Sequence, residues 1–145
     1  MIEAAPELKV IARAGVGVGN IDVEYATERG ILVINTPGKN TNSAAELTMG
    51  LLLSAFRKIV PAHQSMQSLN WDRHRFNGGE LMNKCLGIIG LGNVGHRVAR
   101  YAKSFDMKVQ AFDPYLADEV FERHGVQKVH WITSVSYTQL RAHDT

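Results

Sequence analysis

Residues 86–99 read LGIIGLGNVGHRVA, in which three glycines stand at the spacing G-x-G-x-x-G between an apolar run and a helical pattern. This arrangement is typical of a strand-to-helix turn that binds a dinucleotide. Gly90 permits the tight turn out of the strand, Gly92 lets the backbone approach a pyrophosphate, and Gly95 lets the helix pack closely on the sheet. The spacing is common by itself, so its meaning depends on the residues around it.

The residues after the glycines predict a helix and a second strand. The helix should begin near Asn93, and its first N–H groups and positive dipole end favour an anion at the turn. Five apolar residues at helical spacing form its inward stripe: Val94, Val98, Tyr101, Ala102 and Phe105. The strand 108–112 leads to Asp113, close to the distance of roughly 20 residues at which an acid reaches the ribose of a dinucleotide. A carboxylate there repels a 2′-phosphate, which predicts NAD rather than NADP.

A second strand–helix–strand unit is predicted near the start of the chain. Its elements are a strand at 8–12, a helix at 23–30 and a strand at 31–35. This order predicts parallel pairing of the two strands. The turn RAGVGVGN (13–20) has Asn20 where the third glycine of a nucleotide motif would stand, so it fails that spacing. Two interpretations stay open: a flexible turn, or free backbone N–H groups that hold a small anion beside Arg13.

Residues 43–58 are predicted to form a helix that is apolar on nearly every side and should therefore be buried all round. Ser43 and Glu46 stand at the spacing of a capping box, and Pro61 is expected to end the helix. Such a helix suits a crossing between two structural units. The mixed, polar residues 63–84 predict a shorter helix followed by an irregular arm.

Composition excludes several functional classes. Of the 145 residues, 45% are hydrophobic and 21% charged, which is typical of folded soluble domains. The net charge of +2 comes without a basic run, so no nucleic-acid partner is expected, and no apolar window is long enough to predict a membrane span. The histidines lack ligand-like spacing with cysteines or acids, so no metal site is predicted. The single cysteine, Cys85, is expected to be buried in a cytoplasmic protein.

Four segments, in this order, resemble the NAD-dependent D-2-hydroxyacid dehydrogenases, and within that family the branch that acts on phosphoglycerate. They are RAGVGVGNIDVEYATERGILVINTP (13–37), NSAAELTMGLLL (42–53), WDRHRFNGGELMNKCLGIIGLGNVG (71–95) and AFDPY (111–115). The resemblance implies an α/β fold in which a Rossmann-like parallel sheet follows the closing βαβ unit of a flavodoxin-like substrate domain. Residues 1–42 would end the substrate domain and 43–135 would form part of the NAD-binding domain. Residues 136–145 leave the family pattern and are interpreted as a divergent tail, for which a non-native origin is one explanation.

The same resemblance implies roles for the early glycine turn. Arg13, Ala14 and Gly15 would face the acidic groups of a substrate, and Val16 would touch the nicotinamide side of the cofactor. Gly19 departs from the family pattern, which usually has an aspartate there.

The second glycine turn would bind the rest of the cofactor. Asn93 and Val94 would offer their backbone N–H groups to the pyrophosphate, and Asp113 would bind the adenosine ribose. The three motif glycines, Gly90, Gly92 and Gly95, complete the implied NAD site. Many relatives have an arginine where Asn93 stands, so a neutral contact to phosphate replaces a charged one.

The implied function is hydride transfer between NAD and a D-2-hydroxy acid, with 3-phosphoglycerate as the expected substrate in the first step of serine biosynthesis. Family members form homodimers through the cofactor domain. Their catalytic arginine, acid and histidine come from a later part of that domain, and none of the six histidines here matches the catalytic one. We therefore assign no catalytic residue and expect the chain to be an inactive segment of a longer enzyme. The alternatives are an NAD-binding, dimerising corepressor or sensor, and a stand-alone binding module.

Overall fold

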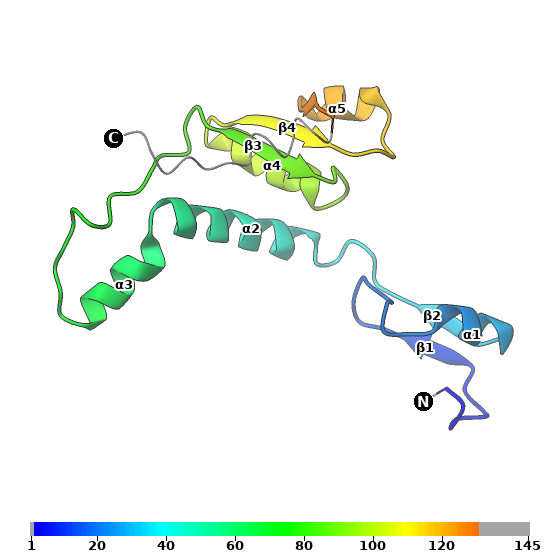
Figure 1. Ribbon diagram of the computed structural model, residues 1–145. Helices are drawn as coiled ribbons and strands as arrows, with labels where there is room; N and C mark the ends of the chain where they lie inside the picture. The colour runs from blue at the N-terminus through cyan, green and yellow to red at the C-terminus, as the bar shows by residue number, and fades with distance from the viewer. Residues whose placement is uncertain (1, 131–145) are drawn as a thin grey trace. The chain divides into compact units, whose positions relative to one another are not determined.

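The computed structural model describes residues 2–130, so the predicted tail at 136–145 lies outside the described residues. The chain divides into two compact units, Met1–Thr41 and Asn42–Thr145, and each is described by itself. Both units contain parallel strands joined by helices (Figure 1). The predicted α/β class with parallel pairing is therefore confirmed.

The first unit is a small βαβ arrangement. Its elements are β1 (Val10–Ala12), α1 (Val23–Glu28) and β2 (Leu32–Ile34). The two strands pair in parallel, with Val10 opposite Leu32. Asp22 caps the start of α1, because its carboxylate accepts the backbone N–H of Tyr25 at 3.0 Å. Gly30 ends the helix region with a φ of +68°, a conformation that glycine adopts without a side-chain clash.

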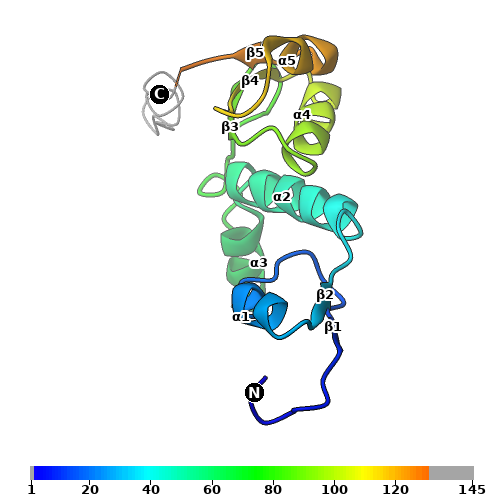
Figure 2. The same ribbon diagram turned by 90° about the vertical axis from the view of Figure 1, so that its right-hand side faces the viewer.

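The second unit contains a parallel sheet in the order β3-β4-β5. The strands are β3 (Cys85–Ile89), β4 (Lys108–Phe112) and β5 (Gln127–Lys128), connected by α4 (Gly95–Ser104) and α5 (Asp118–His124). Figure 2 shows α5 next to β5, the strand that follows it. Leu86 lies opposite Val109 and Ile88 opposite Ala111, so these four side chains share one face of the sheet.

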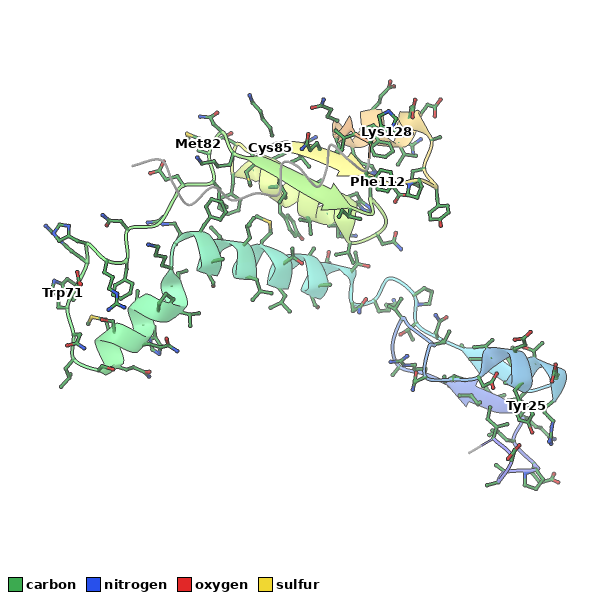
Figure 3. All side chains as sticks on the ribbon, in the orientation of Figure 1. Tyr25, Trp71, Met82, Cys85, Phe112 and Lys128 are labelled. Carbon is green, nitrogen blue, oxygen red and sulfur yellow. The ribbon has the colours of Figure 1, made fainter. Side chains whose placement is uncertain are left out.

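That face forms the core together with the inward stripe of α4. Val98 and Ala102 are buried as predicted, and Val94 and Tyr101 pack against the same core. The prediction for Phe105 is wrong, because this residue caps the end of α4 and is 41% exposed. The expected burial of Cys85 is also wrong. Cys85 begins β3 on the face opposite Leu86 and is exposed (Figure 3).

The long apolar helix differs from the prediction at both ends. It is α2 (Thr41–Phe56), so Ser43 is its third residue and does not cap its start. Lys58 adopts a left-handed conformation with a φ of 52°, which separates α2 from α3 (Ile59–Gln67). Pro61 stands in the first turn of α3, where its missing N–H removes no helical hydrogen bond.

The helix α2 is not buried all round. Ala45 and Met49 lie in the core, whereas Leu47 and Leu51 are more than 60% exposed, at 64% and 62%. Its C-terminus is held by the arm that leads to β3, because the backbone N–H of Gly79 donates to the carbonyl of Phe56 at 3.0 Å. None of the helices within residues 2–130 has the length and apolar character that crossing a membrane requires.

The junction between β3 and α4 depends on two glycines. Gly90 has a φ of +87°, which turns the chain sharply out of β3. A Cβ on Gly95 would overlap the carbonyl oxygen of Gly90 and would lie 3.4 Å from Cγ2 of Ile88. The start of α4 therefore packs directly on the backbone of the turn, as the motif predicts.

We predict that Gly95→Ala lowers the free energy of unfolding by about 1–3 kcal/mol, because the added methyl must displace the Gly90 carbonyl. Urea denaturation followed by circular dichroism measures the change. Gly92→Ala is the matched control, since a Cβ at Gly92 meets no atom within 4 Å. Equal effects of the two substitutions would contradict the packing role of Gly95.

Candidate functional site

The glycine-rich turn presents unpaired donors at the start of α4. Within residues 2–130, four successive backbone N–H groups donate to no acceptor: those of Gly92, Asn93, Val94 and Gly95. The first N–H groups of a helix have no partner inside the helix, and they carry the positive end of its dipole. Gly92 leaves open space where a side chain would stand. The turn can therefore accept an anionic group close to its backbone.

Asp113 stands beside this turn at the end of β4. Its exposed fraction is 9%, and both carboxylate oxygens already accept backbone hydrogen bonds. Oδ2 accepts the N–H of Leu91 at 2.9 Å, and Oδ1 accepts the N–H of Tyr115 at 3.0 Å. The carboxylate is thus fixed next to the unpaired amides, and its remaining lone pairs can accept hydroxyl donors.

One histidine contacts the same turn, and a second stacks on it. The Nδ1 of His96 is 2.8 Å from the carbonyl oxygen of Gly92, so this nitrogen carries the proton that it donates. The ring of His96 stacks on that of His124, with 4.8 Å between centroids. Partial burial lowers the pKa of His124 below its ordinary value of 6.5. Three nearby basic side chains lower it further: His96, Arg123 and Lys103.

The early glycine turn is fastened to the end of β2 through its carbonyl groups. The backbone N–H of Thr36 donates to the carbonyl of Gly15 at 2.9 Å, and the amide Nδ2 of Asn35 donates to the carbonyl of Val16 at 2.8 Å. Within the described residues, the backbone N–H groups of Ala14, Val16, Gly17 and Val18 donate to no acceptor. The carbonyls of Gly15 and Val16 are therefore engaged, and the N–H of Gly15 donates to the carbonyl of Arg13 at 2.9 Å. The choice between a flexible turn and an anion-binding turn stays open.

The side chain of Arg13 lies across the same turn. Its Nη1 donates to Oδ1 of Asn20 at 2.8 Å. A Cβ on Gly15 would lie 3.4 Å from Nε of Arg13, and one on Gly17 would lie 3.8 Å from Nη1. These glycines have no positive φ, so their role is to leave room for the guanidinium rather than to adopt a special turn.

The first unit also contains a cavity whose lining includes Asn20 but none of residues 13–19. It has a volume of about 640 Å³, and the charged residues in its lining are Glu3 and Asp22. Neither Arg13 nor the free amides of the glycine turn contribute to it. Two carboxylates would repel an acidic substrate, so this cavity does not fit the ligand that the glycine turn can hold.

The structure thus brings the predicted residues together in two clusters, one in each unit. The first contains Arg13, Ala14, Gly15 and Val16, and the second contains Gly90, Gly92, Asn93, Val94, Gly95 and Asp113. Sequence reasoning assigned no site role to Asn35, Thr36 or His96. Asn35 was placed at the end of the predicted strand 31–35, and Thr36 was left between that strand and Pro37. The polar pair Asn35 and Thr36 directly before Pro37 was the available signal, since polar side chains at a strand end often bond a neighbouring turn.

Comparison with known proteins identifies the family. Residues 1–142 match the family described as D-isomer specific 2-hydroxyacid dehydrogenase, catalytic domain. The chain belongs to this family. The D-3-phosphoglycerate dehydrogenase of Methanocaldococcus jannaschii is 54% identical over 129 residues, which cover 89% of this chain and 25% of that protein. The hydroxypyruvate reductase of Thermotoga maritima is 50% identical over 114 residues, 79% of this chain and 37% of that protein.

Solved structures of the family share the fold. The D-lactate dehydrogenase of Aquifex aeolicus, solved in complex with NAD and lactic acid, superposes with a TM-score of 0.78 at 30% identity. That match covers 88% of this chain and 38% of the lactate dehydrogenase. The chain therefore spans well under half the length of the relatives it matches.

Proposed function

We propose that this chain forms part of an enzyme that transfers hydride between NAD and a D-2-hydroxy acid, with 3-phosphoglycerate as the substrate, in the first step of serine biosynthesis. The observation that carries the proposal is the row of unpaired amides at the start of α4 beside the buried carboxylate of Asp113. A pyrophosphate needs backbone donors at an open turn, and a ribose needs an acceptor for its hydroxyls. The second unit has both.

The residues present fit NAD in particular. Asn93 and Val94 would donate their N–H groups to the pyrophosphate, and Gly92 leaves the space that this approach requires. Asp113 would accept the ribose hydroxyls and repel a 2′-phosphate. When bound, NAD supplies the carbon that accepts or gives the hydride. Val16 in the first unit, with 39% of its surface exposed, is the residue proposed to contact the nicotinamide side.

Arg13 and the free amides of its turn would bind the acidic groups of the substrate. The guanidinium is held by Asn20, and the amides of Ala14 and Val16 have no acceptor in the described chain. Charge-assisted hydrogen bonds of this kind suit a carboxylate or a phosphate. The 54% identity to a phosphoglycerate dehydrogenase supports 3-phosphoglycerate over other 2-hydroxy acids. The proposed compartment is the cytoplasm, because a chain with a single cysteine forms no internal disulfide.

The enzyme is proposed to act as a homodimer that pairs through the second unit. Several large apolar side chains of α2, α3 and the arm are exposed: Leu47, Leu51, Ile59, Val60, Met66 and Trp71. Figure 3 shows Trp71 in the connection between α3 and β3. Exposed large apolar side chains are common at protein interfaces, which supports this pairing.

The unmodified chain should bind NAD more tightly than NADP in titration calorimetry. Asp113→Ala should weaken NAD binding about tenfold or more and narrow the difference between the two cofactors, because a hydrogen bond to a charged group contributes about 1.5–3 kcal/mol. Asp118→Ala, which removes an exposed carboxylate from α5, serves as the control and should leave the preference unchanged. Tighter binding of NADP by the unmodified chain would refute the role of Asp113.

The 145-residue chain by itself should show no turnover of 3-phosphoglycerate. By its position in the sequence, none of the six histidines matches the general base of the family, a group that contributes about a hundred- to ten-thousandfold to such reactions. NADH absorbance with purified chain, excess NAD and phosphoglycerate measures the activity. The Arg13→Ala, Asp113→Ala double variant is the control, and activity that this variant abolishes would contradict the prediction.

Light scattering should give the mass of a dimer for the unmodified chain. Leu47→Glu with Leu51→Glu should shift it to the monomer, because two charges would enter the apolar surface of α2. The matched control is Asn42→Glu with Ser43→Glu. It adds the same charge in the first turn of α2 and should leave the mass of the dimer unchanged. A monomeric unmodified chain would contradict the proposed pairing.

A further inference from the structure

The glycine-rich turn is held at Leu91 by a side chain rather than by the sheet. The N–H of Gly90 donates to the carbonyl of Phe112 at 2.8 Å, which extends the backbone pairing of β3 and β4 by one residue. The next donor along the chain, the N–H of Leu91, reaches no backbone acceptor. It donates instead to Oδ2 of Asp113 at 2.9 Å.

The same carboxylate fixes a second turn. Its other oxygen, Oδ1, accepts the N–H of Tyr115 at 3.0 Å, directly after Pro114. Asp113 is 9% exposed and Leu91 is 2% exposed, so water has little access to the hydrogen bond between these two residues. A buried N–H without an acceptor costs about as much as a lost hydrogen bond. The turn after β3 and the turn after β4 are therefore connected through one buried side chain.

We propose that Asp113 is a positioning residue that sets the glycine-rich turn before any nucleotide binds. The amides of Gly92, Asn93 and Val94 follow Leu91 directly, so the anchor at Leu91 determines where these donors stand. A site whose donors are already in place loses less freedom on binding. The consequence for nucleotide affinity rests on the proposed function, whereas the positioning of the turn does not.

The chemistry of the anchor requires a carboxylate at this length. Both partners of Asp113 are N–H donors, and an ionised carboxylate offers two acceptor oxygens and no donor. Asparagine would direct its NH₂ group at one of the two donors. Glutamate would keep the charge but would displace both oxygens by one methylene group.

Amide hydrogen exchange in the nucleotide-free chain, followed by NMR, tests the proposal. In the unmodified chain, Leu91 should exchange at least about tenfold more slowly than Asn93, because only Leu91 has an acceptor. Comparable exchange at the two amides would overturn the proposal without any substitution. Added NAD should then slow exchange at Asn93 and Val94, and its failure to do so would count against the proposed function alone.

Substitutions then identify the acceptor. Asp113→Asn and Asp113→Glu should each speed exchange at Leu91 about tenfold or more, while exchange at Ile88 within β3 changes by less than about twofold. Asp106→Asn is the matched control, since Asp106 is exposed, its side chain accepts no hydrogen bond from the described residues, and its φ of 56° suits asparagine. Unchanged exchange at Leu91, or equal acceleration at Leu91 and Ile88, would overturn the proposal.

Discussion

The close approach of α4 to the carbonyl of Gly90 is the constraint on which the second unit depends. Because Gly95 has no side chain, the first turn of the helix can pack on the backbone of the preceding turn. That position lets Val98 and Ala102 reach the face formed by β3 and β4. It also leaves the first amides of α4 at the carboxyl end of the sheet, where they donate to no acceptor within the described residues. The packing of the core and the capacity of the turn to bind an anion therefore both depend on the contact between Gly95 and the carbonyl of Gly90.

In the described residues, both glycine turns have backbone N–H groups that reach no acceptor, but the reason differs between the two turns. At the second turn, the free amides are those that any helix start leaves unpaired. At the first turn, Asn35 and Thr36 donate to the carbonyl groups of Val16 and Gly15. The amides of Ala14, Val16, Gly17 and Val18 reach no acceptor within the described residues. Both turns follow a strand of a parallel pair, and both stand beside a charged side chain. Asp113 accepts donors at one turn, and the guanidinium of Arg13 adds donors at the other.

Much of the fold could be predicted because the spacing of the apolar residues and the positions of the glycines indicate the same helices, strands and turns. The strand at 108–112 was predicted with the bounds that the structure shows, and the order of elements predicted the parallel pairing of β1 with β2 and of β3 with β4. The pairing of β4 with β5 was not predicted. The two ends of α2 were not predicted correctly. Ser43 has a good capping sequence, but the helix begins earlier at Thr41, which is buried. Pro61 is compatible with a first helical turn as well as with a helix end, and only the left-handed Lys58 decided between the two.

By itself, the sequence determined most of the helices and strands up to β4, the need for glycine at Gly90 and Gly95, and the acid at the end of β4. These properties depend on residue type and on short spacings along the chain. Only the tertiary structure decided which partners the polar groups have. Leu91 and Asp113 bond across 22 residues of sequence, and Asn35 bonds Val16 across 19. Such pairs form because parallel strands bring their carboxyl ends to one edge of a sheet, and no local pattern specifies which donor then meets which acceptor.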